Sequence, residues 1–594
     1  MYSIFYLLFY QLCFQYFGNE LTFAYAKSFV KKLDVNNDPA VNINDENTEP
    51  IIGILTQEIS KLISKKFPEK NYKSYIAASY VKFVESSGGR VVPIWIGQPR
   101  EYYEDIMTKI NGILLPGGAT YFNQSNGYHD AGRYIYEIAI EMNDKGIHFP
   151  LWGTCLGFEL LVYLSAHPKE PRTYCSSRAQ ALPLEFEKDY DKSRLFGNAS
   201  ADIIHILKTY PVTANFHLYC FTQETFAAMK LNEIWRVMSL NHDWDGIEFI
   251  STIEHLSSVF SNNDSSSIMC DKDYSPLIGI LCMDIAQELQ RKYGDDIHSY
   301  ISAAYVKYLE SMGARVVPIW INQKRTYYEG IMKKVNGILL PGGAVFLDDS
   351  KCTKNLRNDC VQSSKFIYEI AEEMNKDRKY FPLWGTCLGY QLMLLHSIKG
   401  NSNDIRIECK KMECSLPINL ENSYVLQNSK LLKDCNEELV TAMSQLPFGY
   451  HNHRYCITKQ ILGDFNIADQ WTVLATNKDS EGLEFISVIE HKKYPFFGMQ
   501  IHPEQIYYEY DDNDDERSRC HSFRCLEITQ YFAKFFVQCC HQNKNFCTKA
   551  EALSYLIYNF PIEFTAPYTT RQQCYLFKKN IDYPKIKCES TNAL

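Results

Sequence analysis

The sequence predicts an α/β protein of two tandem domains, each with a mostly parallel sheet flanked by helices. Two observations predict this class: one long module occurs twice in the 594 residues, and in each copy short apolar runs alternate with amphipathic stretches. A chain of this length also exceeds one ordinary hydrophobic core, which by itself favours at least two domains.

The repeat is collinear over long segments. Pro-Ile-Ile-Gly-Ile-Leu at 50–55 returns as Pro-Leu-Ile-Gly-Ile-Leu at 276–281. Asn-Gly-Ile-Leu-Leu-Pro-Gly-Gly occurs at 111–118 and again at 336–343, and Phe-Pro-Leu-Trp-Gly-Thr-Cys-Leu-Gly occurs at 149–157 and 381–389. Because solenoid units repeat every few tens of residues, a period above two hundred indicates duplicated whole domains.

The apolar runs predict strands and the stretches between them predict helices. Branched residues at 52–55, 91–96 and 112–115 are typical of buried strands, and the amphipathic stretch 300–311 predicts a helix. Strands that alternate with helices favour an open, mostly parallel sheet covered on both faces. In such sheets the functional site forms at the carboxyl ends of the strands.

The predicted order along the chain is a signal peptide at 1–26, a first domain at 50–260, a polar linker at 261–275 and a second domain at 276–588. The apolar, aromatic leader ends in Ala24-Tyr25-Ala26, a pattern that signal peptidase recognises, although it has no basic start. A buried N-terminal helix is the alternative. We therefore expect a secreted or lysosomal/vacuolar protein, with no membrane-spanning segment elsewhere.

Composition and net charge limit the kinds of molecule that this protein is expected to bind. The net charge of −9 and the lack of a Lys/Arg run argue against a nucleic-acid surface and favour a small, soluble substrate. Three Asn-x-Ser sequons, at Asn123, Asn198 and Asn263, are candidate glycosylation sites.

Twenty cysteines show no compact disulfide framework. The pairs Cys352 with Cys360 and Cys520 with Cys525 are candidate bridges. The C-terminal cysteines near His541 lack the CxxC pairs of a zinc site, so no metal and no cofactor are expected.

The motif around Cys387 has the form Gly-x-Cys-x-Gly between an apolar strand and a helix-like run. Glycines at such a turn let the backbone fold tightly around an exposed nucleophile, and the partial positive charge of a helix N-terminus favours the thiolate. The amide of Leu388 and the Gly342-Gly343 turn are candidate oxyanion donors. The alternative is a buried structural cysteine.

The general base is predicted at His502, at the end of the extended run Gly-Met-Gln-Ile-His-Pro-Glu. Glu504 lies two residues further, so in an extended chain both side chains project to one side. Glu504 would then orient the imidazole and stabilise its cation, as in a triad. The alternative for Glu504 is a surface carboxylate.

Both halves resemble gamma-glutamyl hydrolase, a relative of the class I glutamine amidotransferases. The matching signals include Leu-Leu-Pro-Gly-Gly-Ala, Trp-Gly-Thr-Cys-Leu-Gly, Gly-x-Glu-Phe-Ile-Ser and Gly-x-Gln-x-His-Pro-Glu, in order across the second half. The resemblance implies two class I glutamine amidotransferase-like (flavodoxin-like) domains. It implies hydrolysis of pteroylpoly-gamma-glutamates through a thioester on Cys387, with His453, and His217 in the first half, in the substrate cleft. A homodimer or an intramolecular pairing of the two copies is also compatible with it.

The first copy departs from this pattern. After the run Gly-Ile-Glu-Phe-Ile-Ser at 246–251 it continues into the linker without a His-Pro-Glu motif, so Cys155 keeps its elbow but loses its base. We expect this copy to be degenerate. The second copy has Gln391 where the first has Glu159. Gln391 resembles the amidotransferase version of this motif. Two alternatives therefore stand beside the hydrolase: a glutamine amidotransferase-type glutaminase, and a non-catalytic binding protein.

Overall fold

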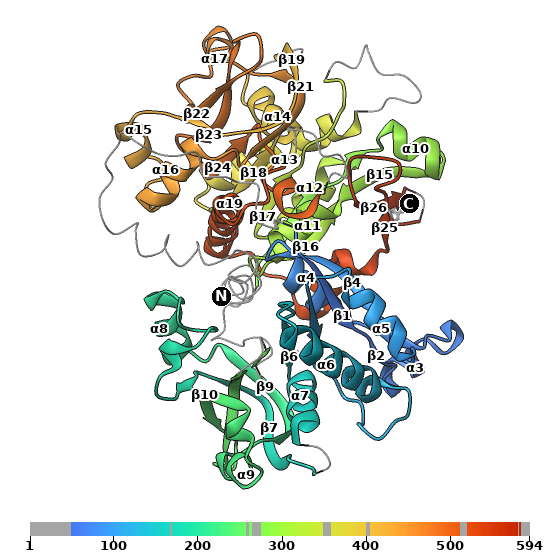
Figure 1. The fold of residues 1–594 in the computed structure, drawn as a ribbon. Coiled ribbons are helices and arrows are strands. Elements are labelled where there is room, and N and C mark those ends of the chain that lie inside the picture. Colours follow the sequence, from blue (N-terminus) through green and yellow to red (C-terminus); the bar gives the residue numbers. More distant parts are fainter. Residues whose placement is uncertain are drawn as a thin grey trace. The chain divides into compact units, whose positions relative to one another are not determined.

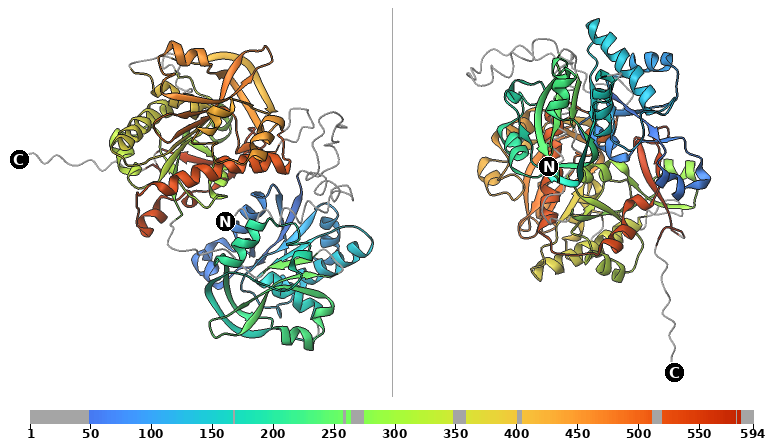
Figure 2. Two further views of the ribbon diagram at one scale, coloured as in Figure 1. Left: turned by 90° about the vertical axis from the view of Figure 1, so that its left-hand side faces the viewer. Right: turned by 90° about the horizontal axis from the view of Figure 1, so that it is seen from below.

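The computed structural model describes residues 49–166, 169–256, 260–263, 275–347, 358–399, 404–510, 519–579 and 581–583. The chain divides into two compact units, Met1–Asp273 and Tyr274–Leu594 (Figures 1 and 2). The predicted signal peptide, residues 264–274 of the predicted linker, and Cys352 lie outside the described residues.

Each unit is built on an eight-stranded sheet, and the two sheets have the same strand order. The first sheet runs β4 (Arg90–Ile94), β1 (Ile51–Leu55), β5 (Gly112–Leu115), β6 (Leu151–Thr154), β12 (Phe260–Asn263), β11 (Glu248–His255), β10 (Trp235–His242) and β8 (Glu185–Phe186). The second runs β16 (Arg315–Ile319), β13 (Leu277–Leu281), β17 (Gly337–Leu340), β18 (Leu383–Thr386), β24 (Phe496–Met499), β23 (Glu484–His491), β22 (Trp471–Lys478) and β20 (Asn419–Leu420). The five strands at one end of each sheet are parallel and the remaining pairings are antiparallel.

Helices cover both faces of the first sheet because its central strands are apolar on both sides. In β5, Ile113 and Leu115 belong to one buried cluster and Leu114 to another. The first cluster includes side chains of α5 (Arg100–Met107), α6 (Tyr128–Asp144) and α7 (Leu156–Ala166). The second includes side chains of α4 (Ala78–Glu85) and α8 (Ala201–Thr209). The predicted α/β class with a mostly parallel sheet is confirmed.

The second unit has the same layers and an additional C-terminal covering. The helices α12 (Arg325–Met332), α13 (Asp359–Lys376) and α14 (Leu388–His396) pack in sequence. The helices α11 (Ala303–Glu310), α16 (Glu437–Gln445) and α18 (Gln505–Tyr508) contact the long helix α19 (Phe523–Gln542), which is orange-red in Figure 1. In α19, Phe532 and Phe536 lie 6.4 and 5.6 Å from the Trp384 ring of β18, measured between ring centroids.

A small sheet also distinguishes the second unit. It consists of β14 (Met283–Asp284), β15 (Ile297–Ser302), β26 (Gln573–Lys578) and β25 (Ile562–Phe564). In the described part of the first unit, its counterpart is the pair β2 (Gln57–Glu58) and β3 (Ser74–Tyr75). The C-terminal segment buries Trp320 to 8% exposure, while the equivalent Trp95 is 49% exposed. Part of the second unit's covering, which includes α19, β25 and β26, thus comes from sequence that follows the repeated region.

Two boundaries differ from the sequence-based expectation. The helix expected over 300–311 begins at Ala303, because residues 300–302 pair with β26 as part of β15. The linker expected to start at residue 261 starts later, because residues 261–263 form β12 between β6 and β11. In both places pairing with a distant strand decides the conformation, which local sequence does not show. Asn263 is therefore inside the sheet, whereas Asn123 and Asn198 are exposed.

Each unit carries a two-stranded ribbon, β7 (Thr173–Leu182) with β9 (Thr213–Cys220) in the first and β19 (Ile407–Leu416) with β21 (Gly449–Cys456) in the second. A disulfide joins Cys175 to Cys220 across the first ribbon. No cysteine spacing indicated this pair, because its partners meet only through strand pairing. The candidate pair Cys520 and Cys525 consists of free thiols with sulfurs 2.9 Å apart.

The Cys175–Cys220 disulfide predicts a stability effect. It closes a loop with a sequence separation of 45 residues, which in the chain-entropy model stabilises the first unit by about 3–4 kcal/mol. We expect Cys175→Ser to lower the denaturant midpoint of the first unit's transition. The matched variant Cys409→Ser, at the equivalent free thiol of the second unit, controls for loss of a buried sulfur. Equal effects of the two variants would contradict a stabilising disulfide.

Candidate active site

Cys387 lies between the end of β18 and the start of α14, at the carboxyl end of the central parallel strands. Its φ is +50°, a region that a residue with a β-carbon rarely adopts. The turn is held because the Cys387 amide donates to the Met499 carbonyl at 2.6 Å. Gly389 allows the close approach of helix and sheet, since a β-carbon there would lie 1.9 Å from the Leu340 carbonyl oxygen. This is the predicted nucleophile elbow.

His502 and Glu504 follow β24, the strand next to that of the cysteine. Their Nδ1 and Oε1 atoms lie 2.8 Å apart, and the two side chains are 7% and 1% exposed. Since Nδ1 faces the carboxylate, the other ring nitrogen remains for Cys387, with which His502 is in hydrogen-bond contact. The structure therefore brings Cys387, His502 and Glu504 together, and Glu504 is not a surface carboxylate.

The electrostatics favour a charged imidazole. Burial lowers the pKa of His502, but the Glu504 carboxylate and the Cys387 thiolate outweigh it and raise this pKa to about 10. The imidazolium is consequently the form of His502 that the site stabilises at neutral pH.

This raised pKa predicts a pH-dependent stability. Relative to the ordinary value of 6.5, the stabilisation from His502 is present in full below pH 6.5 and is lost as the pH rises towards about 10. We expect the denaturant midpoint of the second unit to fall over this range in the wild type and to fall less in His502→Gln. Parallel curves for the two proteins would show that His502 does not titrate as described.

Tyr305 is a site residue for which the sequence suggested no role. Its hydroxyl accepts from the Gly342 amide at 2.8 Å and lies 3.4 Å from His502 Nδ1. Burial raises its pKa well above the usual range, so the hydroxyl stays protonated. The first copy repeats half of this arrangement, with Gly117 donating to Tyr80 at 2.7 Å. The only sequence signal for Tyr305 was that the Tyr-Val-Lys motif it begins is repeated at Tyr80 in the first copy.

The Gly342-Gly343 turn faces the site as predicted, but its two amides differ. The Gly342 amide is engaged by Tyr305, so Gly343 and Leu388 are the remaining candidate oxyanion donors. Leu388 is the first residue of α14, and amides in the first turn of a helix have no partner within the helix. Gly342 packs closely against the site, and its donor role stays a prediction.

Gly342 itself predicts a sharp steric effect. A β-carbon there would lie 2.6 Å from His502 Cε1 and 3.2 Å from Cys387 Cβ, so Gly342→Ala must displace the imidazole or the elbow. We expect kcat/KM to fall by about 100-fold, the cost of a displacement of about 1 Å in catalytic geometry. Gly117→Ala, which meets Tyr80 and Cys155 in the first copy, is the matched control and should leave the rate unchanged. A normal rate for Gly342→Ala would contradict the close packing.

His453 occupies β21, and both of its ring nitrogens have neighbours. Nδ1 lies 3.5 Å from the Cys409 sulfur and Nε2 lies 3.1 Å from Nδ1 of His451. His451 is fully buried, and its own burial, followed by the charges of His453 and His502, lowers its pKa well below the usual range. The sequence suggested no role for His451, which lies on the same face of β21 as His453. In the first copy His217 lies 3.7 Å from the sulfur of Cys175.

The first copy retains the elbow without the other half of the site. Cys155 has a φ of +51° and follows β6 as Cys387 follows β18. The strand β12 pairs with β6 in the register in which β24 pairs with β18. Beyond it the sequence runs Asp-Ser-Ser-Ser-Ile-Met-Cys at 264–270, so no histidine follows the strand.

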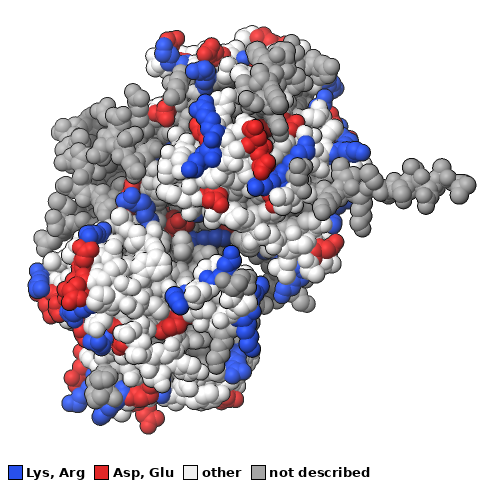
Figure 3. Space-filling model, turned by 90° about the vertical axis from the view of Figure 1, so that its right-hand side faces the viewer, with Lys and Arg blue, Asp and Glu red and all other residues white. Residues whose placement is uncertain are grey.

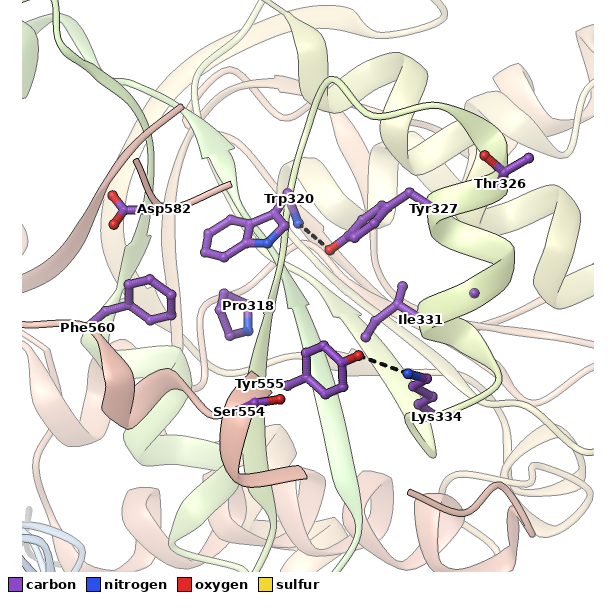
Figure 4. Close-up of a pocket in the computed structure, with 11 residues that line it drawn as sticks. Pro318, Trp320, Thr326, Tyr327, Ile331, Lys334, Ser554, Tyr555, Phe560 and Asp582 are labelled. Carbon is purple, nitrogen blue, oxygen red and sulfur yellow. Dashed lines mark hydrogen bonds between the residues drawn. The ribbon is translucent and has the colours of Figure 1, made fainter. Parts of the chain in front are cut away.

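A cavity of about 440 Å³ lies elsewhere on the second unit (Figure 4). Its lining includes Trp320, Tyr327 and Tyr555, and Lys334 donates to the Tyr555 hydroxyl at 2.8 Å. No residue of the predicted site lines it.

On the face of the molecule in Figure 3, Lys and Arg side chains of the described residues are interspersed with Asp and Glu. In the described ranges, no helix has the length and hydrophobicity needed to span a bilayer.

A cysteine on a strained strand-to-helix turn, facing a buried His–Glu pair at the edge of a mostly parallel sheet, defines a cysteine hydrolase of the α/β class. The chain belongs to the peptidase C26 family, whose model matches residues 50–261 and 276–504. The first match ends before the position at which the second copy carries its His-Pro-Glu motif. The resemblance stated from the sequence is thereby confirmed, including the tandem arrangement.

Individual relatives that match this chain are named gamma-glutamyl hydrolases. Gamma-glutamyl hydrolase B of Dictyostelium discoideum is 35% identical over 314 residues, covering 52% of this chain and 85% of that protein. Gamma-glutamyl hydrolase of Homo sapiens is 33% identical over 309 residues, covering 52% of this chain and 91% of that protein. A solved glutamine amido transferase from Methylobacillus flagellatus aligns with 45% of this chain and 95% of its own, at 10% identity and a TM-score of 0.28.

Proposed function

We propose that the second copy hydrolyses the gamma-glutamyl amide bonds of folylpoly-gamma-glutamates. The observation that carries the proposal is the convergence of Cys387, His502 and Glu504 in one buried site. The names of the relatives support the bond type.

In the proposed mechanism the Cys387 thiolate attacks the gamma-carbonyl carbon, and the developing oxyanion accepts from the Leu388 and Gly343 amides. His502 then donates its proton to the leaving amine as the C–N bond breaks, which gives a gamma-glutamyl thioester. Water attacks the carbonyl carbon of this thioester while His502 takes a proton from the water. The C–S bond breaks, the gamma-carboxylic acid leaves and releases its remaining proton to solvent, and the thiolate–imidazolium pair is restored. Glu504 holds the ring and stabilises its positive charge throughout.

We propose further that only the second copy is active. Cys155 keeps the elbow geometry, but acyl transfer without a neighbouring base is very slow. The first copy would then contribute only as a folded domain. A secreted or lysosomal location is part of the same proposal, which the Ala24-Tyr25-Ala26 pattern and the exposed sequons Asn123 and Asn198 support.

The test is incubation of the purified full chain with pteroylpenta-gamma-glutamate, with separation of the shortened pteroylglutamates and free glutamate by chromatography. Parallel incubation with L-glutamine and assay of ammonia tests the glutaminase alternative. Shortened pteroylglutamates without ammonia release are expected. Ammonia release alone would replace the proposal with the glutaminase, and no product from either would favour a binding protein.

A further inference from the structure

Gln391 is a buried side chain close to the nucleophile that the mechanism above does not use. It lies one helical turn after Cys387 in α14 and is 2% exposed. Its amide group makes three hydrogen bonds, to the Tyr455 backbone carbonyl and to the side chains of Gln500 and Arg406. A group so fully engaged is not available to a substrate.

Two partners of the Gln391 amide fix which way its oxygen and nitrogen point, because one partner can only accept a hydrogen bond and the other can only donate one. The Tyr455 backbone carbonyl, 2.9 Å away, only accepts, so it must face Nε2. The Arg406 guanidinium, 3.3 Å away, only donates, so it must face Oε1. Arg406 is itself held by the Asp404 carboxylate at 2.8 Å and by the Tyr455 ring, 4.7 Å from the guanidinium.

The orientation of the Gln391 amide in turn fixes the orientation of the Gln500 amide. The second N–H of Gln391 faces Gln500 Oε1 at 2.9 Å, which turns Gln500 Nε2 towards the Cys387 sulfur at 3.4 Å. Gln500 is fully buried, so water does not compete for its amide. A hydrogen bond donated to the sulfur stabilises the thiolate more than the thiol.

The first copy offers a natural contrast. Glu159 stands in the place of Gln391, and its Oε2 accepts from Arg172 at 2.9 Å, as Gln391 accepts from Arg406. Burial raises the pKa of Glu159 to about 7, against the opposing effect of Arg172. Once ionised, a carboxylate has no proton to donate, so it cannot fix a neighbouring amide in the way that Gln391 does.

We propose that Gln391 is a positioning residue that keeps the Gln500 amide turned with its N–H towards Cys387 and thereby stabilises the nucleophilic thiolate. The inference rests on the proposed function, because it concerns the nucleophile of the same site. Gln391 acts through Gln500 and touches neither the substrate nor the reacting atoms.

The test follows the rate at which iodoacetamide modifies Cys387 in the full chain as a function of pH, read by mass spectrometry of the Cys387 peptide. Gln391→Met removes the hold on Gln500 without adding charge, and Gln500→Met removes the donor itself. We expect each variant to move the half-maximal rate upward by about 0.5–1 pH unit. The double variant should move it no further than Gln500→Met alone, because the two residues act in series.

Glu159→Gln in the first copy is the matched control and should leave the Cys387 profile unchanged. Gln391→Glu is the second variant in case Gln391→Met unfolds, since the first copy already accommodates glutamate beside an arginine, and it too should shift the profile upward. An unchanged profile in the folded Gln391 variants, or additive shifts in the double variant, would overturn the proposal. Alkylation needs no substrate, so a failure of hydrolysis on pteroylglutamates leaves this readout intact.

Discussion

Cys387→Ala is expected to abolish hydrolysis of pteroylpenta-gamma-glutamate, with a loss in kcat/KM of at least about 10⁴-fold. In the proposed mechanism the Cys387 thiolate forms the covalent bond to the substrate, and in the described site no other nucleophile takes its place at the elbow beside His502. Cys155→Ala is expected to leave kcat/KM within about twofold of the wild type, because the sequence after β12 in the first copy has no His-Pro-Glu motif to supply a base for Cys155. Initial rates of glutamate release measure both effects.

The paired design separates two models of the tandem chain. Both variants remove one sulfur from the same local turn, since Cys155 and Cys387 share the positive φ and the same flanking glycines. Any general effect of the substitution should therefore be common to both. An equal loss in the two variants would show that the first copy takes part in catalysis, and the assignment of a degenerate copy would be wrong.

His502→Gln is expected to lower kcat/KM by about 10⁴-fold, and Glu504→Gln by about 10²–10⁴-fold. In the proposed mechanism His502 carries the proton in both half-reactions, whereas Glu504, 2.8 Å from its Nδ1, orients the ring and balances its charge. Removing the carboxylate also removes the main cause that raises the pKa of His502, so less of the imidazolium is present at neutral pH. The remaining rate of Glu504→Gln should then decline at a lower pH than that of the wild type.

The exposed His242 of the first unit supplies the control, because His242→Gln makes the same chemical change outside the site and should not alter the rate. Iodoacetamide labelling of Cys387 adds a readout independent of the substrate. Labelling should slow in His502→Gln, because the imidazolium that stabilises the thiolate is gone. Undiminished labelling together with undiminished turnover would remove His502 from the mechanism.

Much of this site was predictable because its motifs are local. The turn at Cys387 is specified by a strand, two glycines and a helix within ten residues, and the same pattern appears at Cys155. His502 and Glu504 are two residues apart, so their shared direction follows from backbone geometry alone. The duplication was equally visible, since a repeat needs no structure to be recognised.

The tertiary structure decided what depends on long-range contacts. Tyr305 and His502 are separated by 197 residues and Gln500 and Cys387 by 113, and no spacing in the sequence predicts which polar atoms meet. The same reason explains the Cys175–Cys220 disulfide and the shift of residues 300–302 from helix to strand, both of which depend on pairing with a distant strand. The sequence by itself determined the two α/β domains, and it was enough to name the candidate nucleophile Cys387, the candidate base His502 and the lack of a His-Pro-Glu motif in the first copy. Only the folded chain decided which buried amides and hydroxyls orient them, because hydrogen bonds in a desolvated site are selected by packing across the whole domain.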